Sequence, residues 1–434
     1  MPAVDSSLFA DLQARGLVAQ TTGGDEFEQY LEQKRTLYCG FDPTADSLHI
    51  GSLVPLLTLK RFQLAGHRPI ALVGGATGLI GDPSFKAQER LLTSKDIVTE
   101  WVECLKRQVS QFIDFDSVDH AAILVNNLDW VQPMDVLAFL RDVGKHFSVN
   151  NMINKESVKQ RIEREGEGIS YTEFSYMILQ SLDFAELYKR YGCTLQIGGS
   201  DQWGNITGGV DLVRRLHAGT AHGLTLPLVT KADGSKFGKT ESGTIWLDPA
   251  RTSPYAFYQF WLNAADADVY KFLRYFTFLD IAQLNEIEAA DRAASGKPQA
   301  QAILAREVTE LVHGKAGLEA AERITKALFD STLGSLTETD LQQLKLDGLP
   351  SASVARGELS GKPLTQLLVE SGVVASGKQV KDALGRGAIS INGQAKSSED
   401  NMQTEACFTP EQAYFGRYFL LKMGKKRYFL FEIV

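Results

Sequence analysis

The chain contains 434 residues, with 45 Lys and Arg against 53 Asp and Glu, which gives a formal net charge of −8. At roughly 150 residues per domain, this length predicts two or three domains, each able to bury its own core. A hydrophobic content of 44% and a charged content of 23% are those of an ordinary globular protein, and they exclude a disordered or fibrous chain. The negative charge argues against non-specific coating of DNA, but it does not exclude a local basic patch for RNA.

Cysteine spacing and hydropathy exclude several further classes. Cys39, Cys104, Cys193 and Cys407 are far apart and form no C-x-x-C pair, which excludes a compact disulfide scaffold and the usual zinc sites. The N-terminal segment has no apolar stretch typical of a secretory signal, and the uncharged run at residues 69–81 is too short and glycine-rich to cross a bilayer. We therefore expect a cytoplasmic protein with no membrane segment.

The first half of the chain alternates strand-like and helix-like segments. Strands are predicted at residues 36–41, 69–74, 121–126, 194–198 and 224–230, and helices at 48–65, at 171–190 and after the segment GGSDQWGN. Strands separated by helical crossovers predict an α/β domain with a Rossmann-like, doubly wound parallel sheet. Ligands of such sheets bind at the carboxyl ends of the strands, so the polar residues that follow each strand are the candidate site residues.

The second half has a different pattern. Residues 255–344 are rich in Ala, Leu, Glu and Arg and predict a helical domain, followed by a linker of small residues at 350–358. Two short helix patterns, LTQLLVESG and GKQVKDALGRG, then precede a hairpin in AISINGQA, whose turn is predicted at Asn392-Gly393. These elements predict a small α+β domain at the C-terminal end.

A glycine-rich segment after the second strand, residues 73–81, is similar to the phosphate-binding turn of short-chain dehydrogenases. Three features disfavour nicotinamide binding. Asp82-Pro83 follows at once, the acid expected about 20 residues later falls in a predicted helix, and no Tyr-x-x-x-Lys follows the segment within the predicted α/β domain.

Two other segments together predict a site for nucleotide phosphates. PTADSLHIGS (residues 43–52) opens a helix after the first strand, where His49 can donate to a phosphate and Gly51 lets a nucleotide lie against the backbone. In the lysine loop, KADGSKFGKT (residues 231–240), Lys236 and Lys239 can both reach one polyphosphate. Either segment alone would be an ordinary surface histidine or a solvated basic loop.

In this order, HIGS and KFGKT resemble the HIGH and KMSKS signatures of class I aminoacyl-tRNA synthetases. The segments YCGFDPTADSLHIG, GDPSFKAQER, GGSDQWGN and Tyr176-x-x-x-Gln180-x-x-Asp183-Phe184 resemble the bacterial-type tyrosyl-tRNA synthetases, and the resemblance covers nearly the whole chain. It implies an ATP-dependent tyrosine–tRNA ligase that forms tyrosyl-adenylate and then charges tRNA(Tyr). It also implies a homodimer, Mg²⁺ entering with ATP and no tightly bound cofactor.

The resemblance divides the chain into functional segments. It implies a catalytic domain at residues 1–230, the lysine loop with a helical anticodon-side domain at 231–350, and a linker with a small RNA-binding domain at 351–434.

The resemblance also assigns residues to ATP. Groups expected on the phosphates are Thr44, His49, Lys236, Lys239, Lys86 and Arg90. Groups expected around the ribose and adenine are Cys39, Gly40, Asp42, Gly51, Ser52 and Asp201. Ser52 replaces the second histidine of HIGH and offers a shorter hydroxyl for the ribose contact, whereas KFGKT keeps both lysines of KMSKS.

For tyrosine, the resemblance implies that Tyr38 and Asp183 bind the phenol. Asp82, Tyr176 and Gln180 would accept from the α-ammonium group, and Gln202 would border the carboxylate. The spacing of Tyr176, Gln180 and Asp183 puts them on one helix face, and the apolar sequence YMILQSLDF around them favours a buried face.

The C-terminal end is the candidate RNA surface. Residues 371–434 contain nine basic and six acidic residues, so this part is positively charged while the remainder is acidic. Basic side chains near aromatic ones such as Tyr428 suit an RNA backbone and unstacked bases. The alternative is a solvated lysine-rich end. The candidate residues are Lys378, Lys381, Arg386, Arg417, Lys425, Lys426 and Arg427.

Two alternatives to the tyrosine–tRNA ligase remain open. A tryptophanyl-type synthetase would lack the phenol clamp of Tyr38 and Asp183. A non-catalytic RNA-binding protein on a synthetase scaffold is disfavoured because His49, Lys236 and Lys239 are all present.

Overall fold

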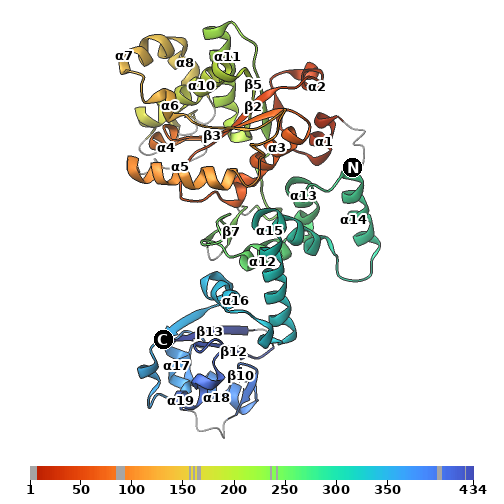
Figure 1. The fold of residues 1–434 in the computed structure, drawn as a ribbon, viewed down its shortest axis with the longest axis vertical. Helices are drawn as coiled ribbons and strands as arrows, with labels where there is room; N and C mark the ends of the chain where they lie inside the picture. Colours follow the sequence, from red (N-terminus) through yellow and green to blue (C-terminus); the bar gives the residue numbers. More distant parts are fainter. Residues whose placement is uncertain are drawn as a thin grey trace. The chain divides into compact units, whose positions relative to one another are not determined.

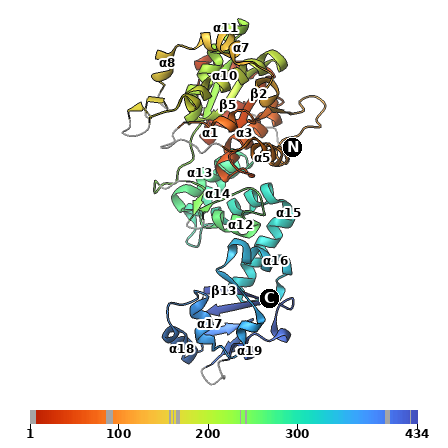
Figure 2. The same cartoon turned by 90° about the vertical axis from the view of Figure 1, so that its left-hand side faces the viewer.

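The computed structural model describes residues 7–84, 93–155, 158–159, 162–163, 168–234, 237–240, 243–397, 403–425 and 427–434. The chain forms two compact units (Figures 1 and 2). The first comprises Met1–Leu247 and Asp266–Ala300, and the second comprises Asp248–Ala265 and Gln301–Val434. These units are divided at positions other than 230 and 350, whose role as limits of functional segments remains a prediction.

The first unit is built on a six-stranded sheet with the order β1-β6-β5-β2-β3-β4. Neighbouring strands are parallel except β1 and β6, which are antiparallel. From β2 the chain moves outward through β3 to β4 on one side, and from β5 to β6 on the other, so the strand order reverses between β2 and β5. Open α/β sheets bind ligands at such a reversal. The strands are β1 (Gln20–Thr21), β2 (Thr36–Phe41), β3 (Arg68–Val73), β4 (Ile123–Asn126), β5 (Cys193–Gly199) and β6 (His222–Leu226).

Helices cover both faces of this sheet, which confirms the predicted Rossmann-like, doubly wound fold. Helices α3 and α5 lie on one face, and α10 and α11 lie on the other (Figure 1). The helices of the first unit are α1 (Leu8–Arg15), α2 (Phe27–Leu31), α3 (Leu53–Leu64), α4 (Thr77–Ile80), α5 (Lys95–Val109), α6 (Leu128–Val131), α7 (Val136–Ala138), α8 (Val149–Ile153), α10 (Tyr171–Tyr191), α11 (Trp203–His217), α13 (Asp266–Phe276) and α14 (Ile281–Ala293). A two-stranded hairpin, β7 (Lys239–Thr240) and β8 (Gly243–Thr244), follows the lysine loop.

Local sequence signals explain where several elements begin and end. Helix α10 begins after Ser170, whose hydroxyl accepts from the backbone N–H of Glu173, and it ends at Gly192 in the left-handed conformation. The strand predicted at 224–230 instead ends at Leu226, because Pro227 has no N–H with which to continue the ladder.

The glycine-rich segment at 73–81 does not open a long helix. Helix α4 has only four residues and ends at Gly81, whose φ is +88°. A Cβ on Gly74 would lie 2.1 Å from Oδ1 of Asp42, so this glycine admits a carboxylate side chain of the protein itself. The geometry therefore removes the main support for the dehydrogenase alternative.

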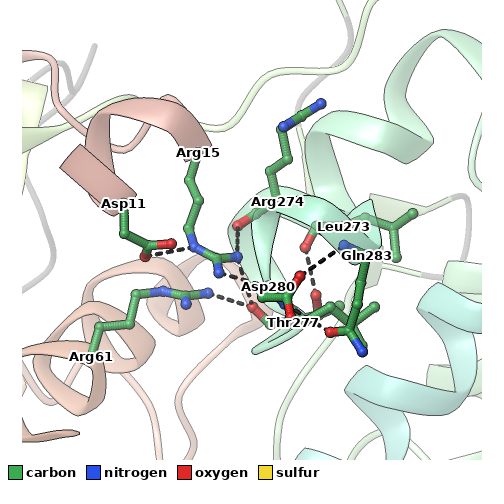
Figure 3. A network of polar contacts seen from close by, with 9 residues as sticks. Asp11, Arg15, Arg61, Leu273, Arg274, Thr277, Asp280 and Gln283 are labelled. Atoms are coloured by element: carbon green, nitrogen blue, oxygen red, sulfur yellow. Dashed lines mark hydrogen bonds and ion pairs between the residues drawn. The ribbon is translucent and has the colours of Figure 1, made fainter. Parts of the chain in front are cut away.

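Two arginines hold the C-terminal end of α13 (Figure 3). Arg15, from α1, donates to the carbonyl oxygens of Arg274, Thr277 and Leu279, and Arg61, from α3, also donates to that of Thr277. These bonds satisfy carbonyl groups that have no partner within the helix. Burial and the nearby Arg15 lower the pKa of Arg61 to about 9.

The second unit combines helices with a five-stranded sheet of order β11-β10-β12-β13-β9. Its helices are α12 (Pro254–Leu262), α15 (Ala300–Asp330, interrupted at Gly314), α16 (Glu338–Gln343), α17 (Leu364–Glu370), α18 (Gly377–Gly385) and α19 (Thr404–Cys407). Its strands are β9 (Ser351–Val354), β10 (Ile389–Ile391), β11 (Gln394–Lys396), β12 (Tyr418–Met423) and β13 (Arg427–Ile433). The turn predicted at Asn392-Gly393 is confirmed, with φ of +48° and +82°.

The linker predicted at 350–358 is wrong in its first half. Residues Ser351–Val354 form β9, which pairs in parallel with β13. Four small residues carry little strand signal of their own, and the partner strand lies almost 80 residues further along the chain. Tyr418, Leu420 and Leu430 of this sheet pack against Ile324 and Leu341 of the helices, so the sheet and helices share one core. Among the described residues, no helix has both the length and the apolar character needed to span a membrane.

Candidate active site

A cavity of about 560 Å³ lies at the reversal of strand order in the first unit. It is lined by residues that follow β2, β3 and β5 and by one face of α10. Fourteen residues predicted for ATP or tyrosine line it together: Tyr38, Cys39, Gly40, Asp42, Thr44, His49, Gly51, Ser52, Asp82, Tyr176, Gln180, Asp183, Asp201 and Gln202. Segments separated by more than 160 residues thus meet in one place.

The other predicted residues of this site cannot be placed. Lys86, Arg90 and Lys236 lie outside the described residues, and Lys239 is described only by its backbone in β7. Gly234 and Phe237, from the same lysine loop, do line the cavity.

At one end of the cavity, Asp183 is held by two buried donors. Trp130 Nε1 donates to Oδ1 at 2.8 Å and Asn127 Nδ2 donates to Oδ2 at 3.0 Å. Burial raises the pKa of Asp183 to about 7, while these two hydrogen bonds oppose the rise. Nearby, the Tyr38 hydroxyl is buried and has no hydrogen-bond partner among the residues that the structure describes, and burial raises its pKa well above the usual range. A buried hydroxyl without a partner costs free energy, so this end of the cavity suits a polar ligand group.

A chain of hydrogen bonds connects Asp183 with a second carboxylate, Asp42. Asn127 Nδ2 also donates to Thr77 Oγ1 at 3.0 Å, and Thr77 Oγ1 donates to Asp42 Oδ1 at 2.7 Å. Tyr176 Oη donates to the other oxygen of Asp42 at 2.6 Å. Burial and the nearby Asp42 raise the pKa of Tyr176 well above its usual range.

The middle of the cavity is acidic. Gln202 Nε2 donates to Asp82 at 2.8 Å and to Asp201 at 2.9 Å, so one amide bridges two carboxylates. Oε1 of Gln180 and Oε1 of Gln196 are both buried, and neither has a hydrogen-bond partner in the described part of the chain. Carboxylates and free carbonyl oxygens together form an environment for a ligand ammonium group.

At the other end, His49 precedes the short 3₁₀ turn Ile50–Ser52 that leads into α3. Its Nδ1 accepts from the backbone N–H of Gly51 at 3.0 Å. In the neutral ring the proton therefore resides on Nε2, which can donate to a phosphate oxygen. A Cβ on Gly51 would lie 2.9 Å from the His49 ring, so the glycine makes room for it.

Sequence reasoning missed four polar residues of this region: Thr77, Asn127, Trp130 and Gln196. Thr77 lies in the glycine-rich segment, which was interpreted only through its glycines. Gln196 is the single polar residue among the buried apolar positions of β5. Asn127 directly follows β4, at the carboxyl edge where ligand-site residues are expected. Trp130 carried no signal, because its indole N–H finds Asp183 only in the folded chain.

In the second unit, the candidate RNA residues divide into two groups. Lys378 and Lys381 on α18 and Arg386 directly after it are exposed, as is Lys425 at the turn between β12 and β13. Arg427, at the same turn, is also exposed, but its guanidinium donates to the carbonyl oxygen of Val373 at 3.1 Å. Lys426 lies outside the described residues.

The remaining candidate, Arg417, is bound by acidic side chains of the same unit. Arg417 forms ion pairs with Glu338 at 2.8 Å and with Glu432 at 3.6 Å. Tyr428 is buried in the shared core and donates to the carbonyl oxygen of Leu328, so its ring is not exposed on the surface where an unstacked base could contact it.

Comparisons with known proteins agree with this geometry. Residues 31–330 match the family model for class I tRNA synthetases (W and Y), and residues 340–431 match that for the tyrosine–tRNA ligase SYY-like C-terminal domain. The chain is 61% identical to the tyrosine–tRNA ligase of Aliivibrio fischeri over 98% of both chains. It is 58% identical to that of Chromobacterium violaceum over 98% of this chain and 99% of the relative.

Among solved structures, a C-terminally truncated mitochondrial tyrosyl-tRNA synthetase of Aspergillus nidulans is 30% identical, with a TM-score of 0.67. The similarity covers 75% of this chain and 94% of that structure. The chain therefore belongs to the bacterial tyrosyl-tRNA synthetases, a family of class I aminoacyl-tRNA ligases.

Proposed function

We propose that this chain activates L-tyrosine with ATP and then transfers tyrosine to the 3′ end of tRNA(Tyr). The tyrosine carboxylate attacks the α-phosphate of ATP, an oxygen–phosphorus bond forms, and pyrophosphate leaves. Neither reactant needs a protein nucleophile, so catalysis consists of positioning and of stabilising charge on phosphate oxygens. The single observation that carries this proposal is one cavity that unites the HIGS segment, the lysine loop and a polar face of α10.

The tyrosine side chain would occupy the end of the cavity at Tyr38 and Asp183. There the ligand phenol donates to the Asp183 carboxylate and accepts from the unpartnered Tyr38 hydroxyl. Asp82, Tyr176 and Gln180 would accept from the α-ammonium group, and Gln202 would border the carboxylate. A tryptophan indole offers a donor but no acceptor, so this pair disfavours the tryptophanyl alternative.

ATP would occupy the other end of the cavity. Nε2 of His49 would donate to a phosphate oxygen at the start of α3, where free backbone N–H groups also favour an anion. We assign Thr44 to the phosphates with His49, Lys236 and Lys239 to the leaving pyrophosphate, and Lys86 and Arg90 to further phosphate contacts.

The remaining residues at this end would surround the nucleoside. We assign to the ribose and adenine Cys39, Gly40, Asp42, Gly51, Ser52 and Asp201. Among the described residues, no group of three or more His, Cys, Asp or Glu side chains could hold a metal ion. Mg²⁺ would enter with ATP and take most of its ligands from the phosphates.

Tyrosine-dependent exchange of pyrophosphate into ATP tests the activity. We expect exchange with tyrosine and not with tryptophan, and we expect His49→Ala to lower the exchange rate far more than the affinity for tyrosine. His146→Ala, a change outside the cavity, is the control. Equal exchange with both amino acids, or none with tyrosine, would refute the proposal.

We propose that tRNA binds to the exposed basic residues of α18 and of the β12–β13 turn. Deletion of residues 371–434 is a poor test, because Tyr418, Leu420 and Leu430 belong to the core shared with the helices. Alanine at Lys378, Lys381 and Arg386 together should instead lower tRNA charging and weaken its dependence on salt, while pyrophosphate exchange stays unchanged. Lys362→Ala, which removes a surface ion pair with Glu370, is the control. Unchanged charging by the triple variant would show that RNA binds elsewhere.

We also propose that the chain acts as a homodimer in the cytoplasm. An apolar patch of two adjacent residues on α7 of the first unit supports this assignment, since Val136 and Leu137 each expose more than 70% of their surface. Contiguous exposed apolar surface marks sites of protein association. Leu137→Glu should yield monomers in sedimentation equilibrium, whereas Leu64→Glu, at another exposed leucine, should not. A dimer in both variants would exclude this patch as the interface.

A further inference from the structure

Helix α13 holds the backbone at the start of the lysine loop. Asp268 lies in the first turn of α13 and is 2% exposed, and both of its carboxylate oxygens lie 3.0 Å from the backbone nitrogen of Ala232, which donates to them. One turn further, Lys271 donates to the carbonyl oxygen of Thr230 at 2.6 Å and forms an ion pair with Asp268 at 3.0 Å. A single charged pair thus binds the backbone on both sides of Lys231.

The same helix supports the far part of the loop. The Phe237 ring stacks on Phe276, with centroids 5.4 Å apart and an interplanar angle of 16°, and it also contacts Phe272 at 5.2 Å. Phe237 directly follows Lys236 and lies two residues before Lys239. Both lysines are therefore close in sequence to a residue that packs on α13.

Helix α13 is in turn attached to the helix that follows the HIGS segment. Arg61 belongs to α3 and donates to the carbonyl oxygen of Thr277, where Arg15 also converges (Figure 3). Since α3 begins directly after the HIGS segment, the HIGS segment and the lysine loop are attached to two helices, α3 and α13, that are bonded to each other.

A short backbone ladder joins the two segments directly. Ile50 N–H donates to the carbonyl oxygen of Ile245, and Ile245 N–H donates to that of Gly238 in the lysine loop, at 2.9 and 3.0 Å. Gly238 has a φ of +76°, and a Cβ there would lie 2.5 Å from the Ile50 side chain. These contacts hold Gly238 of the loop beside the HIGS segment. The attachment of the loop to α13 must therefore be compatible with this position.

We propose that Asp268, together with Lys271, is a positioning residue for ATP. Asp268 does not line the cavity, and it acts by fixing the entry of the lysine loop, so that Lys236 and Lys239 meet the polyphosphate at the correct distance. Positioning errors of about 1 Å are enough to lower an enzymatic rate substantially. This inference depends on the proposed function, because it assigns the loop lysines to pyrophosphate.

Steady-state pyrophosphate exchange, with ATP and tyrosine varied separately, tests the proposal. Asp268→Ala should lower kcat/KM for ATP by about 10- to 100-fold, which corresponds to the loss of one hydrogen bond to a charged group. The KM for tyrosine should stay within about 2-fold, because the tyrosine end of the cavity is not touched. Asp268→Asn should lower kcat/KM for ATP by a smaller factor, since its side-chain carbonyl oxygen can still accept from the backbone N–H of Ala232.

The control is Tyr270→Phe on the same helix, which removes the hydrogen bond from Tyr270 to Asp291 and touches no part of the loop. It should behave as wild type. If Asp268→Ala does not fold, as judged by circular dichroism, then Asp268→Asn and Lys271→Met carry the same test.

A double-mutant cycle separates positioning from general stability. With Lys236→Ala and Lys239→Ala combined as one arm of the cycle, Asp268→Ala should cause little further loss, because its effect passes through these two lysines. Additive losses, or equal losses in the ATP and tyrosine parameters, would overturn the inference. A wild-type chain without tyrosine-dependent exchange would instead refute the proposed function.

Discussion

Replacing Trp130 by phenylalanine should change the pH dependence of tyrosine activation. Trp130 Nε1 donates to Asp183 Oδ1 at 2.8 Å, and Asn127 is the second donor to this carboxylate. Both hydrogen bonds favour the ionised form and oppose the rise in pKa that burial causes. Phenylalanine keeps an aromatic ring at this buried position and removes only the N–H donor.

The magnitude follows from the strength of that hydrogen bond. A hydrogen bond to a charged group contributes about 1.5–3 kcal/mol, and 1.36 kcal/mol corresponds to a tenfold change in a proton equilibrium. The pKa of Asp183, about 7 in the wild type, should therefore rise to roughly 8–9 in Trp130→Phe. At pH 7.5 the ionised fraction would fall about 3- to 25-fold.

The assay is kcat/KM for tyrosine in pyrophosphate exchange, measured across the pH range, since this ratio reports groups of the free enzyme. The ligand phenol needs an ionised acceptor, so the wild-type ratio should fall as pH drops through about 7. In Trp130→Phe the fall should begin roughly one to two pH units higher, while Trp101→Phe on α5 should follow the wild type. An unshifted acid limb, or a loss equal at every pH, would refute the electrostatic reasoning and leave only a packing role for Trp130.

Three further predictions concern stability and site geometry. In the wild type, the pKa of Asp183 is raised on folding from 3.8 to about 7, so the stability that its neutral form provides is complete below pH 4 and is lost as pH rises towards 7. Asp183→Asn lacks this dependence, and its free energy of unfolding relative to wild type should increase by about 4 kcal/mol between pH 4 and 8 in urea titrations; a constant difference would contradict the raised pKa. Gly74→Ala should destabilise the protein by about 1–3 kcal/mol and impair exchange, because its Cβ would clash with Asp42; wild-type activity would show that Asp42 can move freely. Arg61→Met should cost about 1–3 kcal/mol of unfolding free energy by removing a buried hydrogen bond to Thr277, and an unchanged urea midpoint would show that Arg15 alone holds this helix end.

The alternation of strands and helices follows from the sequence alone, and the phosphate contacts of the HIGS segment and the lysine loop are a prediction from the sequence. Local signals were sufficient there: Thr36–Phe41 is a strand as predicted, and α10 ends at a glycine that adopts the left-handed conformation. The face of α10 with Tyr176, Gln180 and Asp183 also followed from helical periodicity, since spacing along one helix needs no tertiary information.

The tertiary structure decided which distant groups meet. Strand β9 forms from four small residues because β13 offers an open edge, Tyr428 is buried because helices cover its sheet, and Trp130 and Asn127 reach Asp183 across 53 and 56 residues. The hydrogen bond from Ala232 to Asp268 also joins distant segments, and the sequence around Asp268 gives no indication of this partner. Such contacts depend on how elements pack, and packing is set by the whole core and not by any local stretch of sequence.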